Sequence, residues 1–66
     1  MQVLVNGESK EYADNTTIAD VIHTLGLEGR RIAVELNQDI VPKSQHAHCL
    51  LQAGDRLEIV HAIGGG

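Results

Sequence analysis

The chain has 66 residues, and its five Lys and Arg against nine Asp and Glu give a formal charge of −4. A chain this short forms one small domain that buries about 60% of the surface exposed in its unfolded form, which leaves little room for an enclosed active-site cleft. The acidic charge disfavours binding to nucleic-acid phosphates or to an anionic membrane, and it indicates a partner with a basic surface. Because Tyr12 is the only aromatic residue, base-stacking platforms are also excluded.

The compartment is predicted from the cysteine content and from the amino-terminal sequence. Cys49 is the single cysteine and cannot form an internal disulfide, whereas small secreted domains usually contain several. Met1 is followed by a strand-like segment without the pattern of a signal peptide. No apolar run approaches the roughly 20 residues that a transmembrane helix needs. We therefore expect a soluble protein of the reducing cytoplasm.

A β-hairpin is expected at the amino terminus. Residues 1–6 and 9–12 have strand character, and they flank Asn6-Gly7, a dipeptide that tolerates the positive φ angles of a two-residue hairpin turn.

A helix is expected next, over residues 17–25. Apolar residues recur there with the spacing of one helical face, namely Ile18, Val21, Ile22 and Leu25. Thr17 can cap the helix, Asp20 lies in the first turn where the helix dipole favours an anion, and Gly26 can end it in a left-handed conformation.

Three further strands are expected in the second half. Residues 32–36 alternate as in a half-buried strand, and the turn 37–39 leads to a short strand at Ile40-Val41 before Pro42 stops regular pairing. Residues 56–62 form the last strand. Its expected inner face comprises Leu57, Ile59 and His61, and its outer face comprises Glu58, Val60 and Ala62.

These elements predict a two-layer α+β domain, with one main helix on one face of a mixed five-stranded sheet. A right-handed crossover through the helix and a last strand that returns beside the first give the ubiquitin-like β-grasp arrangement. The domain is expected to span residues 1–62, followed by a flexible glycine-rich tail at 63–66.

The glycines Gly64, Gly65 and Gly66 are the most informative feature for function. A tail without Cβ atoms can enter a channel too narrow for side chains. Its terminal carboxylate is a poor acyl donor until it is activated, most simply by adenylation from ATP on another protein. The tail would then be a substrate and this chain would not be an enzyme. The alternative is that the glycines are incidental to function.

Other reactive side chains carry weaker signals. His46, His48 and Cys49 include zinc-ligand types, but a closed structural site needs four ligands. We expect them to be loop and surface residues, with Cys49 at least half-buried and His23 a surface residue beside the helix stripe. Cysteine catalysis is disfavoured, because sequence adjacency to His48 does not supply a positioned base. No bound metal is expected.

The last strand also presents an apolar outer face that continues into the tail. Val60, Ala62 and Ile63 lie on this stretch, beside the expected reactive end, and they form a candidate docking surface for a partner. The alternative is that these residues cover part of a small core.

The chain resembles the ThiS family of sulfur carriers, within the ubiquitin-like MoaD/ThiS group. The resemblance is carried by Met1 to Gly7, by residues 32–37 with Ile40-Val41-Pro42, by Gly54-Asp55, and by the terminal Gly-Gly. It implies that Gly66 is adenylated by a ThiF-type enzyme and becomes a thiocarboxylate, with Gly64 and Gly65 threading the partners' channels.

The same resemblance implies the partners. A cysteine desulfurase would supply the sulfur, and a ThiG-type thiazole synthase would accept it for the thiazole ring of thiamine. No cofactor would be bound by this chain, and ATP would be used by the activating enzyme. The alternatives are a MoaD-like carrier for molybdopterin or another acceptor, a non-covalent β-grasp adaptor, and a small metal-binding domain.

Overall fold

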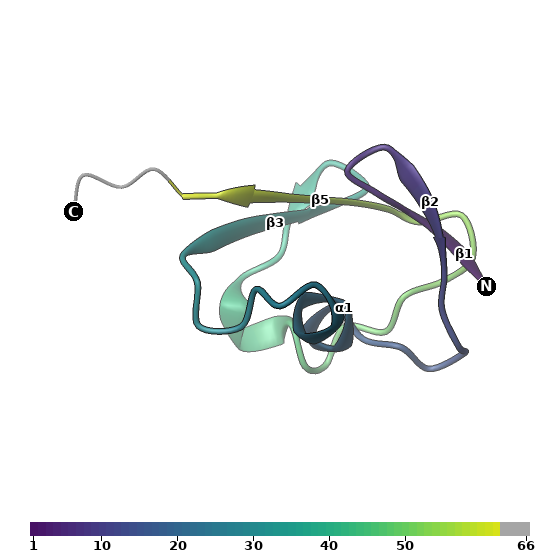
Figure 1. The fold of residues 1–66 in the computed structure, drawn as a ribbon, viewed down its shortest axis with the longest axis horizontal. Helices are drawn as coiled ribbons and strands as arrows, with labels where there is room; N and C mark the ends of the chain where they lie inside the picture. The colour runs from purple at the N-terminus through teal and green to yellow at the C-terminus, as the bar shows by residue number, and fades with distance from the viewer. Residues whose placement is uncertain (63–66) are drawn as a thin grey trace.

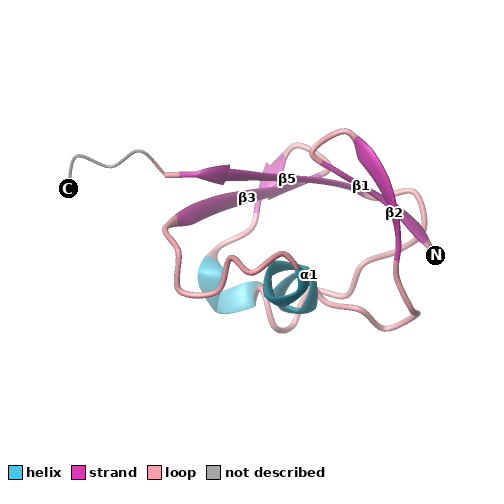
Figure 2. Cartoon of the chain, viewed as in Figure 1, coloured by secondary structure: helices cyan, strands magenta, loops and turns pink. Residues whose placement is uncertain are grey.

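The computed structural model describes residues 1–62; residues 63–66, and with them the predicted tail, lie outside the described part. One sheet forms one layer, and a short helix and a 3₁₀ turn form the other (Figures 1 and 2). The elements in chain order are β1 (Gln2–Val5), β2 (Glu8–Glu11), α1 (Ile18–Thr24), β3 (Ile32–Leu36), β4 (Asp39–Ile40), η1 (Lys43–Gln45) and β5 (Arg56–His61).

The sheet has the strand order β2-β1-β5-β3-β4, with β5 parallel to β1 and antiparallel to β3. The last strand thus lies at the centre beside the first, which confirms the predicted β-grasp arrangement. The 3₁₀ turn η1 was not predicted, because three residues are too few for a helical period to show in the sequence.

Helix α1 begins and ends where the sequence predicts. Thr17 is its N-cap: its hydroxyl accepts from the backbone N–H of Asp20 at 3.1 Å, and the Asp20 carboxylate accepts from the N–H of Thr17 at 2.9 Å. This reciprocal capping box satisfies two of the amide groups that a helix start leaves without partners. Gly26 follows the last turn with a φ of +72°.

The core lies between α1 and the inner face of the sheet. Its buried residues are Val3, Val5, Ile18, Val21, Ile22, Val34, Leu51, Leu57 and Ile59. The alternation expected for the last strand is confirmed for Leu57 and Ile59, which are buried. His61 continues that face but is exposed, because β5 extends beyond the part of the sheet that α1 covers (Figure 1).

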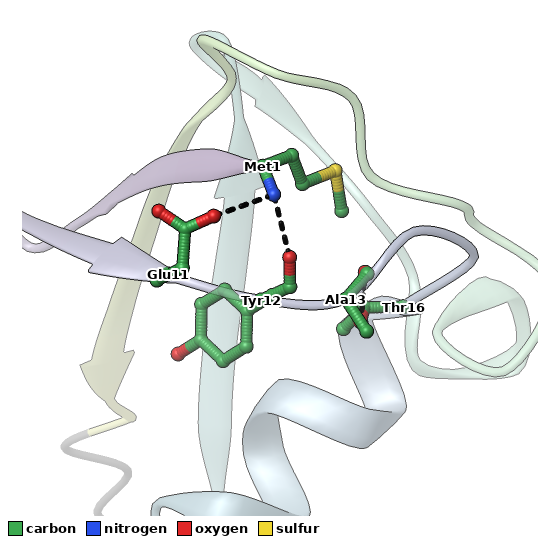
Figure 3. Close-up of polar contacts among 5 residues, drawn as sticks. All are labelled: Met1, Glu11, Tyr12, Ala13 and Thr16. Carbon is green, nitrogen blue, oxygen red and sulfur yellow. Dashed lines mark hydrogen bonds and ion pairs between the residues drawn. The ribbon is translucent and has the colours of Figure 1, made fainter.

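Met1 closes the open end of the first hairpin (Figure 3). Its amino group donates to Glu11 Oε2 at 2.8 Å and to the carbonyl of Tyr12 at 2.7 Å. The N–H of Tyr12 donates in return to the carbonyl of Met1 at 2.9 Å. Just beyond, the Thr16 hydroxyl donates to the carbonyl of Ala13 at 2.6 Å, which tightens the turn that leads to α1. The start of β1 is thereby held beside the end of β2.

Asparagines in the two hairpin turns hold β5 from both sides. Asn6 and Asn37 have φ angles of +50° and +52°, as the turns require. The Asn6 side chain accepts from the N–H of Ile59 at 2.7 Å and donates to its carbonyl at 3.1 Å. The Asn37 side chain accepts from the N–H of Arg56 at 3.0 Å and donates to Asp55 at 3.1 Å. Each asparagine therefore permits the positive φ of its turn and also supplies side-chain hydrogen bonds that connect the turn to β5 or to the residue before it.

We expect Asn6→Ala to lower the free energy of unfolding by about 1 to 3 kcal/mol, because Ile59 loses partners for its N–H and its C=O. Urea unfolding would measure the loss. Asn15→Ala is the matched control, since Asn15 also has a positive φ, +70°, but contributes no side-chain hydrogen bond within residues 1–62. Equal losses for the two variants would show that the bonds to Ile59 contribute nothing.

Candidate functional site

The structure defines where the predicted reactive tail is attached. β5 is the central strand, and its carboxyl end lies at the edge of the molecule opposite Met1 (Figure 1). At this end, the last described backbone hydrogen bond is the one that the N–H of Ala62, just after β5, donates to the carbonyl of Arg31, just before β3, at 2.9 Å. Ile63, Gly64, Gly65 and Gly66 follow and lie outside the described residues.

Strand β5 is held in place by the core and by the strands on both of its sides. Leu57 and Ile59 are buried between the sheet and α1, at 0% and 6% exposure. Five register pairs join β5 to β3, from Ile32 opposite His61 to Leu36 opposite Leu57. On the other side β1 pairs with the first part of β5, and the Asn6 side chain extends that contact to Ile59. The end of β5 is therefore positioned by the folded domain.

Val60 lies on the outer face of the sheet and is 56% exposed, so this side chain does not belong to the core. Beside it, Ile40 is 74% exposed. An open hollow of about 400 Å³ separates them, and its lining residues are Ala33, Glu35, Gln38, Ile40, Glu58 and Val60. Ala62 is also exposed, while Ile63 lies outside the described residues. The apolar stretch predicted from the sequence is thus continued by Ile40, which the sequence reasoning did not include.

Two carboxylates face the same hollow. Glu35 and Glu58 are exposed, and they are direct register partners on the antiparallel pair β3 and β5. Like charges directly opposite each other destabilise a sheet. A cation from another molecule would relieve that repulsion, so the outer face combines exposed apolar side chains with a site of concentrated negative charge.

His46 is a correction to the sequence prediction, which placed it on the surface. It is 7% exposed, and its Nε2 donates to the carbonyl of Val41 at 3.0 Å. The reason is that the segment after η1 folds back against the start of α1, where Ala19 N–H donates to the carbonyl of His46 at 3.0 Å. Burial of a polar ring is tolerated because that ring has a partner.

His48 and Cys49 are the other members of the His/Cys group. His48 is exposed and Cys49 is half-buried against the core, as expected from the sequence. Over the part of the chain that the structure describes, no three His, Cys, Asp or Glu side chains come together as metal ligands would. In the described structure, Cys49 packs against the core and the His46 ring hydrogen-bonds to the loop backbone.

His23 is the exposed histidine beside the helix stripe, as predicted. Its Nδ1 lies 2.7 Å from Glu28 Oε1. The hydrogen bond that His23 donates to the Glu28 carboxylate, with the negative charge of that carboxylate, raises the pKa of His23 above its ordinary value of 6.5. At the other end of the helix, the backbone and hydroxyl of Thr17 lower the pKa of Asp20 below 3.8.

The pair of His23 and Glu28 predicts that the stability of the fold depends on pH. A raised pKa in the folded state means that the protonated His23 stabilises the fold fully below pH 6.5, and that this stabilisation is lost as pH rises through the folded pKa. Glu28→Gln should return the pKa of His23 toward 6.5, as followed by NMR titration of the ring protons. Glu8→Gln is the control, since Glu8 is not among the carboxylates that raise the pKa of His23. An unchanged His23 midpoint in the variant would contradict this assignment.

Comparisons with known proteins place these features in a family. A sequence profile described as the ThiS family matches residues 3–66. The chain is 32% identical to the Escherichia coli sulfur carrier protein ThiS over the full length of both chains. It is 35% identical to the Bacillus subtilis sulfur carrier protein ThiS over 63 residues, which cover 94% of this chain and 96% of that one.

Longer proteins also match. The chain is 42% identical over all 66 residues to a thiazole synthase of Paramagnetospirillum magneticum, but it spans only 20% of that protein's length. Among solved structures, the thiamine biosynthesis protein ThiS of Geobacter metallireducens superimposes with a TM-score of 0.85 at 23% identity over the whole of both chains, which is a likeness of fold. Within residues 1–62 no helix is long and apolar enough to cross a membrane. On the family profile and the end-to-end match to a sulfur carrier protein, this chain belongs to the ThiS family.

Proposed function

We propose that this chain is a cytoplasmic sulfur carrier whose Gly66 carboxylate is converted to a thiocarboxylate that donates sulfur to the thiazole ring of thiamine. The end-to-end match with a sulfur carrier protein supports the proposal most strongly, together with a family profile that extends to Gly66. The chain acts as a co-substrate and not as an enzyme. It binds no cofactor of its own in this scheme.

The chemistry proceeds in three steps. A ThiF-type enzyme joins an oxygen of the Gly66 carboxylate to the α-phosphorus of ATP, and pyrophosphate leaves. A persulfide, formed with the sulfur of free cysteine by a cysteine desulfurase, then attacks the acyl carbon through its outer sulfur, and AMP departs with that oxygen. A thiol finally attacks the inner sulfur of the resulting acyl disulfide, takes it as a disulfide, and leaves the Gly66 thiocarboxylate. The glycines at 64 and 65 suit this chemistry, because a segment without side chains fits the channels that lead to enclosed sites.

A thiazole synthase is the proposed acceptor. Two proteins named thiazole synthase, from Paramagnetospirillum magneticum and Magnetococcus marinus, match this chain over all 66 residues at 42% and 35% identity. In each the match covers 20% of the protein. A carrier-like segment within a protein of that name favours thiazole synthesis over molybdopterin synthesis as the destination of the sulfur.

Mass spectrometry of the intact protein tests the proposal. Incubation with a ThiF-type enzyme, ATP, cysteine, a desulfurase and a thiol reductant should add the mass difference between sulfur and oxygen to the chain, and tandem fragmentation should locate it at Gly66. Omitting ATP should prevent the change. An unmodified carboxylate in the complete mixture would overturn the proposal.

The outer face of the sheet is the proposed docking surface. It combines Val60, Ala62 and Ile40 with the opposed carboxylates Glu35 and Glu58. It also lies on the strand that leads to Ile63 and the glycines. A partner that contacts this face would present apolar side chains around a Lys or Arg, which would neutralise two carboxylates that repel each other in the free domain.

We expect Val60→Ser to weaken binding to the activating enzyme about tenfold, as for truncation of a buried interface residue. Titration calorimetry would measure the dissociation constant. Leu50→Ser is the matched control, since Leu50 is 55% exposed against 56% for Val60 but lies by Met1, away from the end of β5. If the two variants bind alike, this face is not the docking surface.

A further inference from the structure

The far end of β5 has an open edge that the rest of the domain leaves unpaired. On the β3 side, the carbonyl of Arg56 accepts from the N–H of Asn37, and the N–H of Ala62 donates to the carbonyl of Arg31. Backbone groups alternate in direction along an antiparallel strand, so the even-numbered residues of β5 point their N–H and C=O groups toward β3. The odd-numbered residues therefore point toward β1. His61 is the last of these in the described chain, and its N–H and C=O face the side of β1.

Strand β1 ends before it can reach that position. The N–H of Leu4 donates to the carbonyl of Asp55, and the N–H of Asn6 donates to the carbonyl of Leu57, each at 2.9 Å. The side chain of Asn6 then bonds both backbone groups of Ile59. Beyond Asn6 the chain turns away into β2, so within residues 1–62 the backbone groups of His61 have no partner on this side. Figure 1 shows β5 extending past β1 at this end.

The proposed function brings a partner to this edge. If Gly66 reacts within an enzyme, that enzyme must hold a group only five residues from His61, a distance of at most about 18 Å along a fully extended chain. The partner enzyme therefore comes within that distance of the end of β5 whenever the carboxylate is in place. An edge amide and carbonyl buried there need hydrogen-bond partners, since a buried donor or acceptor without one loses the hydrogen bond that it made to water.

We propose that an extended segment of the ThiF-type activating enzyme adds to the sheet along the β1 side of β5 and pairs with the N–H and C=O of His61. This is strand addition, in which backbone bonds contribute affinity whatever the side chains are. The added segment continues the position in the sheet that β1 and the Asn6 side chain occupy up to Ile59. This pairing positions the end of β5 so that the tail can enter the enzyme. The inference rests on the proposed function.

His61→Pro tests the inference, because it removes the N–H that faces the open edge and leaves every bond to β3 in place. His61→Ala is its matched control, since it removes the same side chain and keeps the N–H. We expect His61→Pro to weaken binding to the ThiF-type enzyme about tenfold or more relative to His61→Ala. The urea midpoints of the two variants should agree.

A second measurement does not depend on the proline. Ligation at Cys49 joins residues 1–48 to a synthetic peptide of residues 49–66 that carries an N-methyl group on His61. This protein keeps the His61 side chain, lacks the donor, and should bind as weakly as His61→Pro. In the unmodified chain, hydrogen exchange at the His61 amide should slow at least tenfold when the partner is added.

The outcomes separate this inference from the proposed function. If the unmodified chain gains the sulfur mass but the proline and N-methyl proteins bind like the alanine control, strand addition is overturned and the carrier function stands. Unchanged exchange at His61 in the complex would overturn it as well. Self-association of the unmodified chain that is abolished by His61→Pro, with partner binding unaffected, would assign the edge to a second copy and overturn the proposal. Absence of the sulfur mass in the unmodified chain would instead count against the carrier function.

Discussion

Deletion of Gly65 and Gly66 is expected to abolish thiocarboxylate formation and to leave the free energy of unfolding unchanged. The core and the hydrogen bonds of β5 that the structure describes lie within residues 1–62, so the loss of two terminal residues removes none of these. The new end, Gly64, would stop short of the activating enzyme's ATP by two residues, about 7 Å of extended chain. Intact-mass spectrometry after incubation with the activating system would read the first effect, and urea unfolding would read the second.

Gly66→Ala is the companion variant, because it keeps the length of the tail and adds one Cβ. We expect slower activation than in the unmodified chain, since a methyl group beside the reacting carboxylate must fit a channel shaped for glycine. If the chain without Gly65 and Gly66 still forms a thiocarboxylate in the complete mixture, the assignment of Gly66 is wrong. A non-covalent adaptor, in contrast, would keep its function after the deletion.

Val21→Asp is expected to unfold the domain. Val21 is 0% exposed, in the centre of α1 and against the inner face of the sheet. A carboxylate there would have to be buried without a partner or protonated, at a cost of several kcal/mol. The whole domain, at about 0.05 to 0.15 kcal/mol per residue, is stabilised by roughly 3 to 10 kcal/mol. A single substitution therefore removes most or all of the stability.

Circular dichroism and the dispersion of amide NMR signals would show the loss of the fold. Thr24→Asp is the control, since it introduces the same residue into the same helix at an exposed position. Its expected loss is at most about 1 kcal/mol, from the unfavourable dipole at the end of the helix. A folded Val21→Asp protein with a normal urea midpoint would mean that the packing of α1 on the sheet is not what stabilises this domain.

Much of the fold could be predicted because its signals are local. The i, i+3, i+4 spacing from Ile18 to Leu25 and the Thr17 and Asp20 pair predict α1 without reference to the rest of the chain. The Asn6-Gly7 dipeptide predicts the first hairpin, and the alternation of residues 32–36 predicts β3. The family resemblance was also available from the sequence, since its motifs are stretches of consecutive residues.

His46 and Asn6 show where local signals are insufficient. His46 is buried because the loop that contains it folds back on α1. No residue near His46 in the sequence predicts its contact with that helix. Asn6 was predicted from its tolerance of positive φ, while its bonds to Ile59, 53 residues away, depend on β5 returning beside β1. The same holds for the docking surface, where Ile40 joins Val60 only because β4 and β5 flank β3.

The sequence by itself determined α1, the five strands and the position of the glycines at 64–66, since each depends on residues close together in the chain, and the order of these elements predicted the β-grasp class. The tertiary structure decided which residues meet across the sheet: Glu35 opposite Glu58, Ile40 beside Val60, and the His61 edge beyond the reach of β1. The physical reason is that strand register is a property of two chain segments at once. A shift of one residue would exchange the two faces of a strand, and only the packed core selects one register.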